Sequence, residues 1–183
     1  MSSTLLNKQL YRVMKTVLAL MCIATLGCSS TSIATDWHFG EALAIRVKEV
    51  RLVDEVSYSF EEEHFRINST QDGYKIAAAL IEMRSRGANI VYLSVKKDTV
   101  RLRDGTFVDY SPIDPFEDRI KVSEISSMEN AIIPFVWGEV ALPRKCGDLE
   151  FCELMGWVLF EVPAEIEFHQ LIWDTADTIF LRF

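Results

Sequence analysis

The chain has 183 residues, and its 27 acidic and 19 basic side chains give a formal net charge of −8 at neutral pH. Such a surface repels nucleic-acid phosphates and anionic lipid headgroups, which argues against nucleic-acid binding and against membrane contact through a basic patch. Once a targeting segment is set aside, the remaining length suits one domain of ordinary size.

Residues 1–27 have the features of a secretory signal peptide. Lys8, Arg12 and Lys15 precede an apolar stretch at 17–24, and no acidic residue occurs before Asp36. A bilayer span needs about 20 apolar residues, so this stretch is too short to cross a membrane and suits a signal sequence instead. Met14, directly before Lys15, is an alternative initiator to Met1.

The apolar stretch ends in Leu26-Gly27-Cys28, which resembles the lipobox of bacterial lipoproteins, although Thr25 replaces the usual aliphatic residue. The resemblance implies a diacylglyceryl group on the Cys28 thiol and cleavage just before it. The mature chain would then keep 16 basic and 27 acidic side chains, a net charge of −11. We therefore expect a lipoprotein of the bacterial cell envelope, and Ser29 favours the outer membrane. The alternatives are a plain signal peptide or an uncleaved anchor.

Residues 28–41 read as a polar tether, and a strand follows. Ile45 and Val47 alternate with charged residues, and the alternation resumes one position later at Val50 and Leu52. A single slip in a period of two predicts a β-bulge. Residues 57–72 are polar and acidic and are predicted to form a loop.

The segment 73–83 is ambiguous, because its alanines and leucine would also suit a helix ended by Gly87. Residues 90–102 alternate clearly, and Asp104-Gly105 then predicts a hairpin with a two-residue type I′ turn. Residues 111–134 read as an insertion, with one short helix expected at 119–130. Strands are predicted again at 157–163, from Leu171, and at 178–183. Short strands at this spacing favour an all-β fold, an antiparallel β-sandwich.

Three motifs, spread in order over 42–183, resemble a known family. They are the Gly73-Tyr74-Lys75-Ile76 strand start, the Val-x-Leu-x-Asp-Gly hairpin at 100–105, and the Gly-Trp-x-x-Phe-x-Val-Pro strand at 156–163 with a closing strand from Asp177. They are similar to exported bacterial immunoglobulin-like domains of unknown function, sometimes labelled telomeric-repeat-binding-factor-2-like. The resemblance implies an immunoglobulin-like sandwich in which 74–83 is a strand. It carries no catalytic residue, and the segment 111–134 is longer here than in the family.

Two cysteines remain in the domain, Cys146 and Cys152, with five residues between them. In an exported protein this pair predicts a local disulfide. Zinc binding is the alternative, and it would need two further ligands. His38, His64 and His169 do not have a matching spacing.

No catalytic motif occurs, so we expect a protein that is not an enzyme and uses no cofactor or metal. Three features are candidates for binding: an acidic stretch for Ca²⁺, the apolar run 132–137 as a docking edge, and the four tryptophans as the lining of a ligand groove. The plainer alternatives are a solvated loop for the first and core packing for the other two. The acidic stretch contains Asp109, Asp114, Glu117 and Asp118. Trp157 and Trp173 are expected in the core.

The leading hypothesis is a lipid-anchored, non-enzymatic module that binds a protein or surface component of the envelope. A second hypothesis is an accessory subunit of an envelope complex, docking through 111–137, a segment that could then be deleted without loss of the fold. The third is a hydrolase that depends on the histidines.

Overall fold

The computed structural model describes residues 36–125, 127–149 and 151–183. The predicted signal peptide, Cys28 and most of the predicted tether lie outside these residues. The described strands are β1 (His38–Phe39), β2 (Leu43–Val53), β3 (Glu55–Phe60), β4 (Glu63–Asn68), β5 (Tyr74–Ser85), β6 (Ile90–Val95), β7 (Val100–Asp104), β8 (Asp109–Tyr110), β9 (Ile120–Val122), β10 (Gly138–Pro143), β11 (Glu153–Pro163), β12 (Phe168–Thr175) and β13 (Asp177–Arg182).

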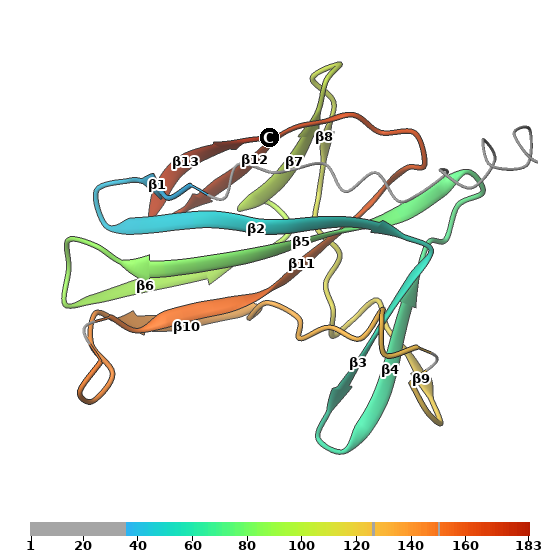
Figure 1. Ribbon diagram of the computed structural model, residues 1–183, viewed down its shortest axis with the longest axis horizontal. Coiled ribbons are helices and arrows are strands. Elements are labelled where there is room, and N and C mark those ends of the chain that lie inside the picture. Colours follow the sequence, from blue (N-terminus) through green and yellow to red (C-terminus); the bar gives the residue numbers. More distant parts are fainter. Residues whose placement is uncertain (1–35, 126, 150) are drawn as a thin grey trace, which may run out of the picture. The chain divides into compact units, whose positions relative to one another are not determined.

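The strands form two layers and a smaller sheet beside them (Figure 1). One layer has the order β1-β2-β5-β11, and the other consists of β13-β12-β7-β8 and the ribbon β10-β6. The third sheet is β3-β4-β9. Every strand pair is antiparallel, which confirms the all-β sandwich. The prediction of a helix at 119–130 was wrong, because in the described part of this segment β9 is followed by bends and turns.

Strand β5 lies at the centre of its sheet, paired with β2 and β11. Its odd-numbered residues from Ala77 to Met83 point into the main core between the layers. Ile76 and Ala78 point to the outer face and join a second core with β3 and β4. Both faces are therefore buried, which explains why the apolar run showed no clear period of two. The helical interpretation of 73–83 was wrong, because hydrogen bonds from two neighbouring strands satisfy this backbone.

The predicted bulge in β2 is confirmed. The register between β2 and β5 shifts between Val47 and Glu49, so Lys48 is the extra residue. The bulge keeps Ile45 and Val47 on the inner face before it, and lets Val50 and Leu52 pack against the same core after it.

The predicted loop at 57–72 was wrong, because most of it belongs to the β3–β4 hairpin. Val56 and Tyr58 on one strand and Phe65 and Ile67 on the other are buried at alternate positions. These apolar residues lie on one face of the hairpin and the polar residues on the other, which hid the strands within an acidic sequence.

The hairpin predicted at Asp104-Gly105 forms between β7 and β8, but its turn is not of type I′. The residue with positive φ near the turn is Phe107, at 66°. The Asp104 carboxylate accepts hydrogen bonds from the backbone N–H groups of Thr106 and Val108, at 2.9 Å each. An aspartate that bonds to the backbone ahead of it favours this longer turn.

Candidate binding surface

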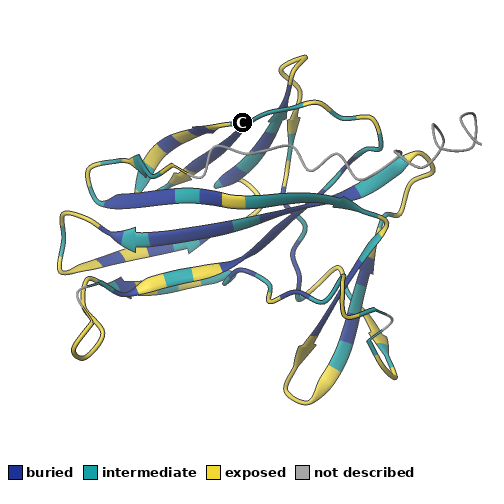
Figure 2. Cartoon of the chain, viewed as in Figure 1, coloured by how far each residue is buried: buried dark blue, intermediate teal, exposed yellow. Residues whose placement is uncertain are grey.

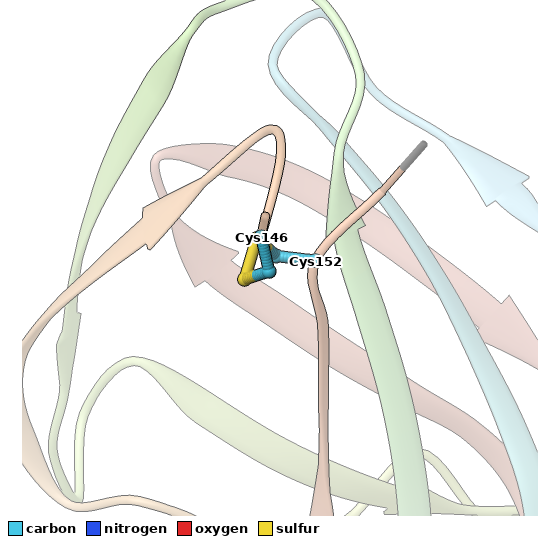
Figure 3. The surroundings of a disulfide bond; sticks show 2 residues. All are labelled: Cys146 and Cys152. Atoms are coloured by element: carbon cyan, nitrogen blue, oxygen red, sulfur yellow. A yellow bond between two sulfur atoms is a disulfide. The ribbon is translucent and has the colours of Figure 1, made fainter. Parts of the chain in front are cut away.

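Cys28, the predicted lipid-attachment site, lies outside the described residues. The disulfide predicted between Cys146 and Cys152 is formed, with 5.2 Å between the Cα atoms (Figure 3). It closes the loop between β10 and β11, and the N–H of Cys152 donates to the carbonyl of Arg144. Cys152 is buried in the main core, so the bond ties this loop to the sandwich.

The carboxylates considered as Ca²⁺ ligands form ion pairs and hydrogen bonds within the chain. Asp109 pairs with Arg103 at 2.5 Å, and Asp118 pairs with Lys97 at 3.1 Å. Asp114 accepts the N–H groups of Phe116 and Glu117. Among the residues that the structure describes, no group of three or more histidine, cysteine or acidic side chains could hold a metal ion.

The three histidines lie in different sheets, on β1, β4 and β12. The His64 Nδ1 atom lies 2.8 Å from the Ser59 hydroxyl, at an exposed position of the β3–β4 hairpin. His38 contacts the carbonyl of Asp36, and His169 stacks edge-on against Phe107.

Other carboxylates hold loops in place. The Glu161 carboxylate accepts hydrogen bonds from the loop 69–71, including the Thr70 hydroxyl and the Gln71 N–H. Burial alone would raise the pKa of Glu161, but these hydrogen bonds outweigh it and lower the pKa. Asp177 accepts the N–H groups of Glu41, Ala42 and Leu43, which fixes the start of β2 against β13.

The hollows of the described molecule do not resemble a ligand pocket. The larger, of about 410 Å³, is an open, polar depression formed by Asp174–Thr178 at the β12–β13 turn. The smaller, of about 10 Å³, lies among apolar side chains including Val95, Phe135 and Val158. A site for a small molecule is usually a concave, largely apolar pocket of several hundred Å³, and neither of these two hollows has both features.

The most distinct surface belongs to what we call the lobe: β3, β4, β9 and the connecting segment 111–134. The lobe packs on the outer face of β5 and β11 and projects beyond the sandwich (Figure 1). The segment 111–134 is part of this packing, since Ile113 donates its N–H to the carbonyl of Leu159 and Ile132 is 8% exposed. Because the segment contributes to the second core, we expect its deletion to destabilise the fold, which differs from the expectation that it could be removed without loss of the fold.

Arg119 lies at the centre of the lobe. Its guanidinium carbon lies 3.8 Å from the centre of the Phe65 ring, and the rings of Phe60 and Phe116 lie within 6 Å. The Tyr58 hydroxyl donates to the carbonyl of Pro115 nearby. Burial raises the pKa of Tyr58, and the contact with Arg119 opposes that shift. These contacts hold the connecting segment firmly against the hairpin.

The surface of the lobe combines apolar side chains with a strained turn. Four large apolar residues are exposed there: Phe60 42%, Ile120 50%, Met128 83% and Ile133 76%. Glu61 and Glu62 form the hairpin turn with φ angles of 51° and 66°, a conformation that glycine and asparagine adopt more readily. Exposed apolar groups next to strained backbone are common features of binding sites.

Most of the apolar run 132–137 serves the core rather than a docking edge. Phe135 is 2% exposed, and its N–H donates to the carbonyl of Trp157. Ile133 is the exception and points to solvent. Trp157 and Trp173 are both buried, as predicted.

No helix in the described part of the chain is both long enough and apolar enough to cross a membrane. No protein-family model matches the chain, and no curated protein matches its sequence. A crystal structure of a candidate lipoprotein from Bacillus subtilis is similar to 79% of this chain, at 11% sequence identity and a TM-score of 0.48. The chain spans about a third of that protein's length, 34%.

Proposed function

We propose that this protein is a lipoprotein of the bacterial cell envelope, held through Cys28, with an immunoglobulin-like domain that binds a protein or surface component. The observation that supports binding is the lobe, which presents Phe60, Met128 and Ile133 to solvent around a strained turn. The observation that supports the anchor is the lipobox-like Leu26-Gly27-Cys28, eight residues before the described domain begins.

The polar residues of the described domain support a non-enzymatic role. Asp104, Glu161 and Asp177 are engaged with backbone groups of nearby loops. Their hydrogen bonds stabilise turns and loops of the domain. Binding through a surface formed by loops and strand ends suits a rigid sandwich.

The second candidate is an accessory subunit of an envelope complex. It would use the same surface, but in permanent contact with its partner. The exposed Met128 and Ile133 favour this role, because obligate interfaces are more apolar than transient ones.

The binding surface can be tested by site-specific photo-crosslinking in cells. A photoreactive residue at Met128 or Ile133 should give a discrete crosslinked product with an envelope component. The matched control is Met155, which is similarly apolar and 53% exposed but lies on β11 outside the lobe. Products of equal yield from all three positions, or from none, would contradict binding through the lobe. A partner that co-purifies in detergent without any crosslinking favours the accessory subunit.

A further inference from the structure

Three loops meet at the end of the sandwich where the chain enters the domain. They are the β1–β2 loop, the β5–β6 turn and the disulfide loop between β10 and β11, all on one side of Figure 1. Arg86 donates its backbone N–H to the carbonyl of Ala42 at 2.7 Å, and Arg144 donates to Asn89 at 2.8 Å. We call these loops, with Trp37, Phe39 and the adjoining ends of β5 and β6, the entry end.

Aromatic side chains that begin the domain lie on two arginines, Arg84 in β5 and Arg86 just after it. The Arg84 guanidinium carbon lies 4.4 Å from the centre of the Trp37 ring and 4.6 Å from that of Phe151. The Arg86 guanidinium lies over Phe39 and donates to the carbonyl of Gly40. The chain is therefore fixed to the domain from Trp37 onward.

The cations of the entry end differ from most others in the domain. Many lysines and arginines elsewhere have a carboxylate partner, such as Arg103 with Asp109 and Lys97 with Asp118. Within the described residues, no ion pair is formed by the entry-end cations, which are Arg84, Arg86, Arg144 and Lys145. A guanidinium or ammonium group without a carboxylate partner can donate its N–H groups to an external anion.

The same end carries exposed apolar side chains: Phe39 58%, Ile90 48%, Tyr92 73% and Leu149 65% (Figure 2). Its acidic residues in the sequence are Glu41, Asp148, Glu150 and Glu153. They equal the four cations in number, so the entry end is close to neutral in a chain whose net charge is −8. Basic and aromatic groups beside exposed aliphatic ones are the composition that proteins present to the interface of a membrane.

The length of the tether limits how far the entry end can lie from the proposed anchor. Seven residues lie between Cys28 and Asp36, where the described domain begins. At about 3.5 Å per residue, a fully extended tether spans about 28 Å. The lobe packs on the opposite half of β5, around Ile76 and Ala78.

We propose that the entry end rests on the phospholipid headgroups of the membrane. Arg86, Arg144 and Lys145 contact lipid phosphates, while Phe39 and Leu149 enter the interface. The lobe then points away from the membrane, toward its partner. This inference rests on the proposed lipid anchor at Cys28, and it adds an orientation that the anchor alone would not impose.

Hydrogen–deuterium exchange of the full-length, cell-processed protein tests the orientation. The protein is placed in phosphatidylethanolamine–phosphatidylglycerol vesicles and, separately, in a nonionic detergent. Exchange in segments 86–92 and 144–149 should be several-fold slower in vesicles, and exchange at the lobe turn, 60–64, should be equal in both. A combined variant, Arg86→Gln, Arg144→Gln and Lys145→Gln, should lose most of this protection. These side chains are exposed, so the variant is expected to fold, and an unchanged unfolding midpoint would verify that.

Equal exchange in vesicles and detergent, from protein whose mass shows acyl chains, would overturn the orientation and leave the anchor standing. Protection of these segments in native envelopes but not in protein-free vesicles would also overturn it, since that pattern assigns the entry end to a protein partner. A mass without acyl chains would contradict the proposed lipid anchor and also the orientation, which depends on it. Intact mass measured on the same samples separates these failures.

Discussion

The outer face of the β5–β11 pair has two halves that are stabilised in different ways. At one end, Ile76, Ala78 and Leu159 are covered by the lobe in a dry apolar core. At the other end, the same side of β5 carries Glu82 and Arg84, which contact charged and aromatic groups. One strand therefore supports two kinds of surface, and the change occurs over a few residues near Leu80.

The two halves of the strand therefore have different roles. The covered half attaches a projecting lobe rigidly, because close packing leaves little freedom at that junction. The charged half fixes the entering chain with contacts that are individually weak and mostly solvent-accessible. The first half should therefore dominate stability, and the second should mainly determine how the domain is held.

Leu159→Ala should have the largest effect. Leu159 is 1% exposed in the second core, and truncation leaves a cavity, so we expect a loss of about 3 kcal/mol in the free energy of unfolding. Urea unfolding measures it. The matched control is Met155→Ala, on the same strand and face but 53% exposed, which should change stability by less than about 0.5 kcal/mol. Equal losses from both variants would show that the lobe contributes no tight packing.

Glu82→Gln should have the next largest effect. Glu82 is 3% exposed and accepts hydrogen bonds from Arg46 at 2.8 to 3.0 Å, with Lys48 at 3.1 Å. Hydrogen bonds to charged groups contribute about 2 kcal/mol, which is the loss expected at pH 7.

The loss from Glu82→Gln should also depend on pH. Burial alone would raise the pKa of Glu82, but the hydrogen bonds from Lys48 and Arg46 outweigh it and lower the pKa below 4.5. A lowered pKa in the folded state gives stability that is present above 4.5 and is lost as the pH falls through the folded-state value. The difference between wild type and variant should therefore shrink in acid. A difference that stays constant from pH 7 to pH 3 would contradict this account.

Replacing the lobe turn should stabilise the protein. Glu61 and Glu62 both have positive φ, and the combined Glu61→Asn, Glu62→Gly variant supplies the residues that a type I′ turn favours. We expect a gain of about 2 kcal/mol in unfolding free energy, because each of the two left-handed glutamates costs about 1 kcal/mol. If the turn's strain serves binding, crosslinking from Met128 should fall in the same variant. If the variant is more stable but crosslinks equally well, the strain of the turn plays no part in binding.

Trp37→Ala should have the smallest effect on stability, about 1 kcal/mol, because each of the two cation–π contacts of this half-buried ring contributes little. Its ring lies over both Arg46 and Arg84, so removal should free the entering chain. Limited proteolysis near residue 40 should therefore accelerate while the unfolding midpoint hardly moves. Phe180→Ala, at an exposed position of β13, is the control and should leave proteolysis unchanged.

The sequence was sufficient where a single strand carries its own pattern. The shift between Val47 and Val50 predicted the bulge in β2, and the cysteine spacing predicted the disulfide. It failed where burial on two faces removed the pattern, as in β5. It also failed at 57–72, where the apolar positions of β3 and β4 alternate within an acidic segment and the turn uses glutamates in place of asparagine and glycine.

The candidate surfaces could not be predicted for a different reason. Arg119 meets Phe65 across more than fifty residues of sequence, and Arg84 meets both Trp37 and Phe151. Such contacts depend on how distant loops come together, and a local pattern in the sequence does not predict them. Lipid attachment at Cys28 stays a prediction from the sequence, made because the lipobox that it resembles is a short and contiguous motif.

The most direct test of the account is the intact mass of the protein extracted from the membranes of cells that make it, beside a Cys28→Ala variant. The account predicts a chain that begins at Cys28 and carries acyl chains, and a variant that lacks them. An unacylated chain, cleaved elsewhere and recovered from the soluble fraction, would contradict it.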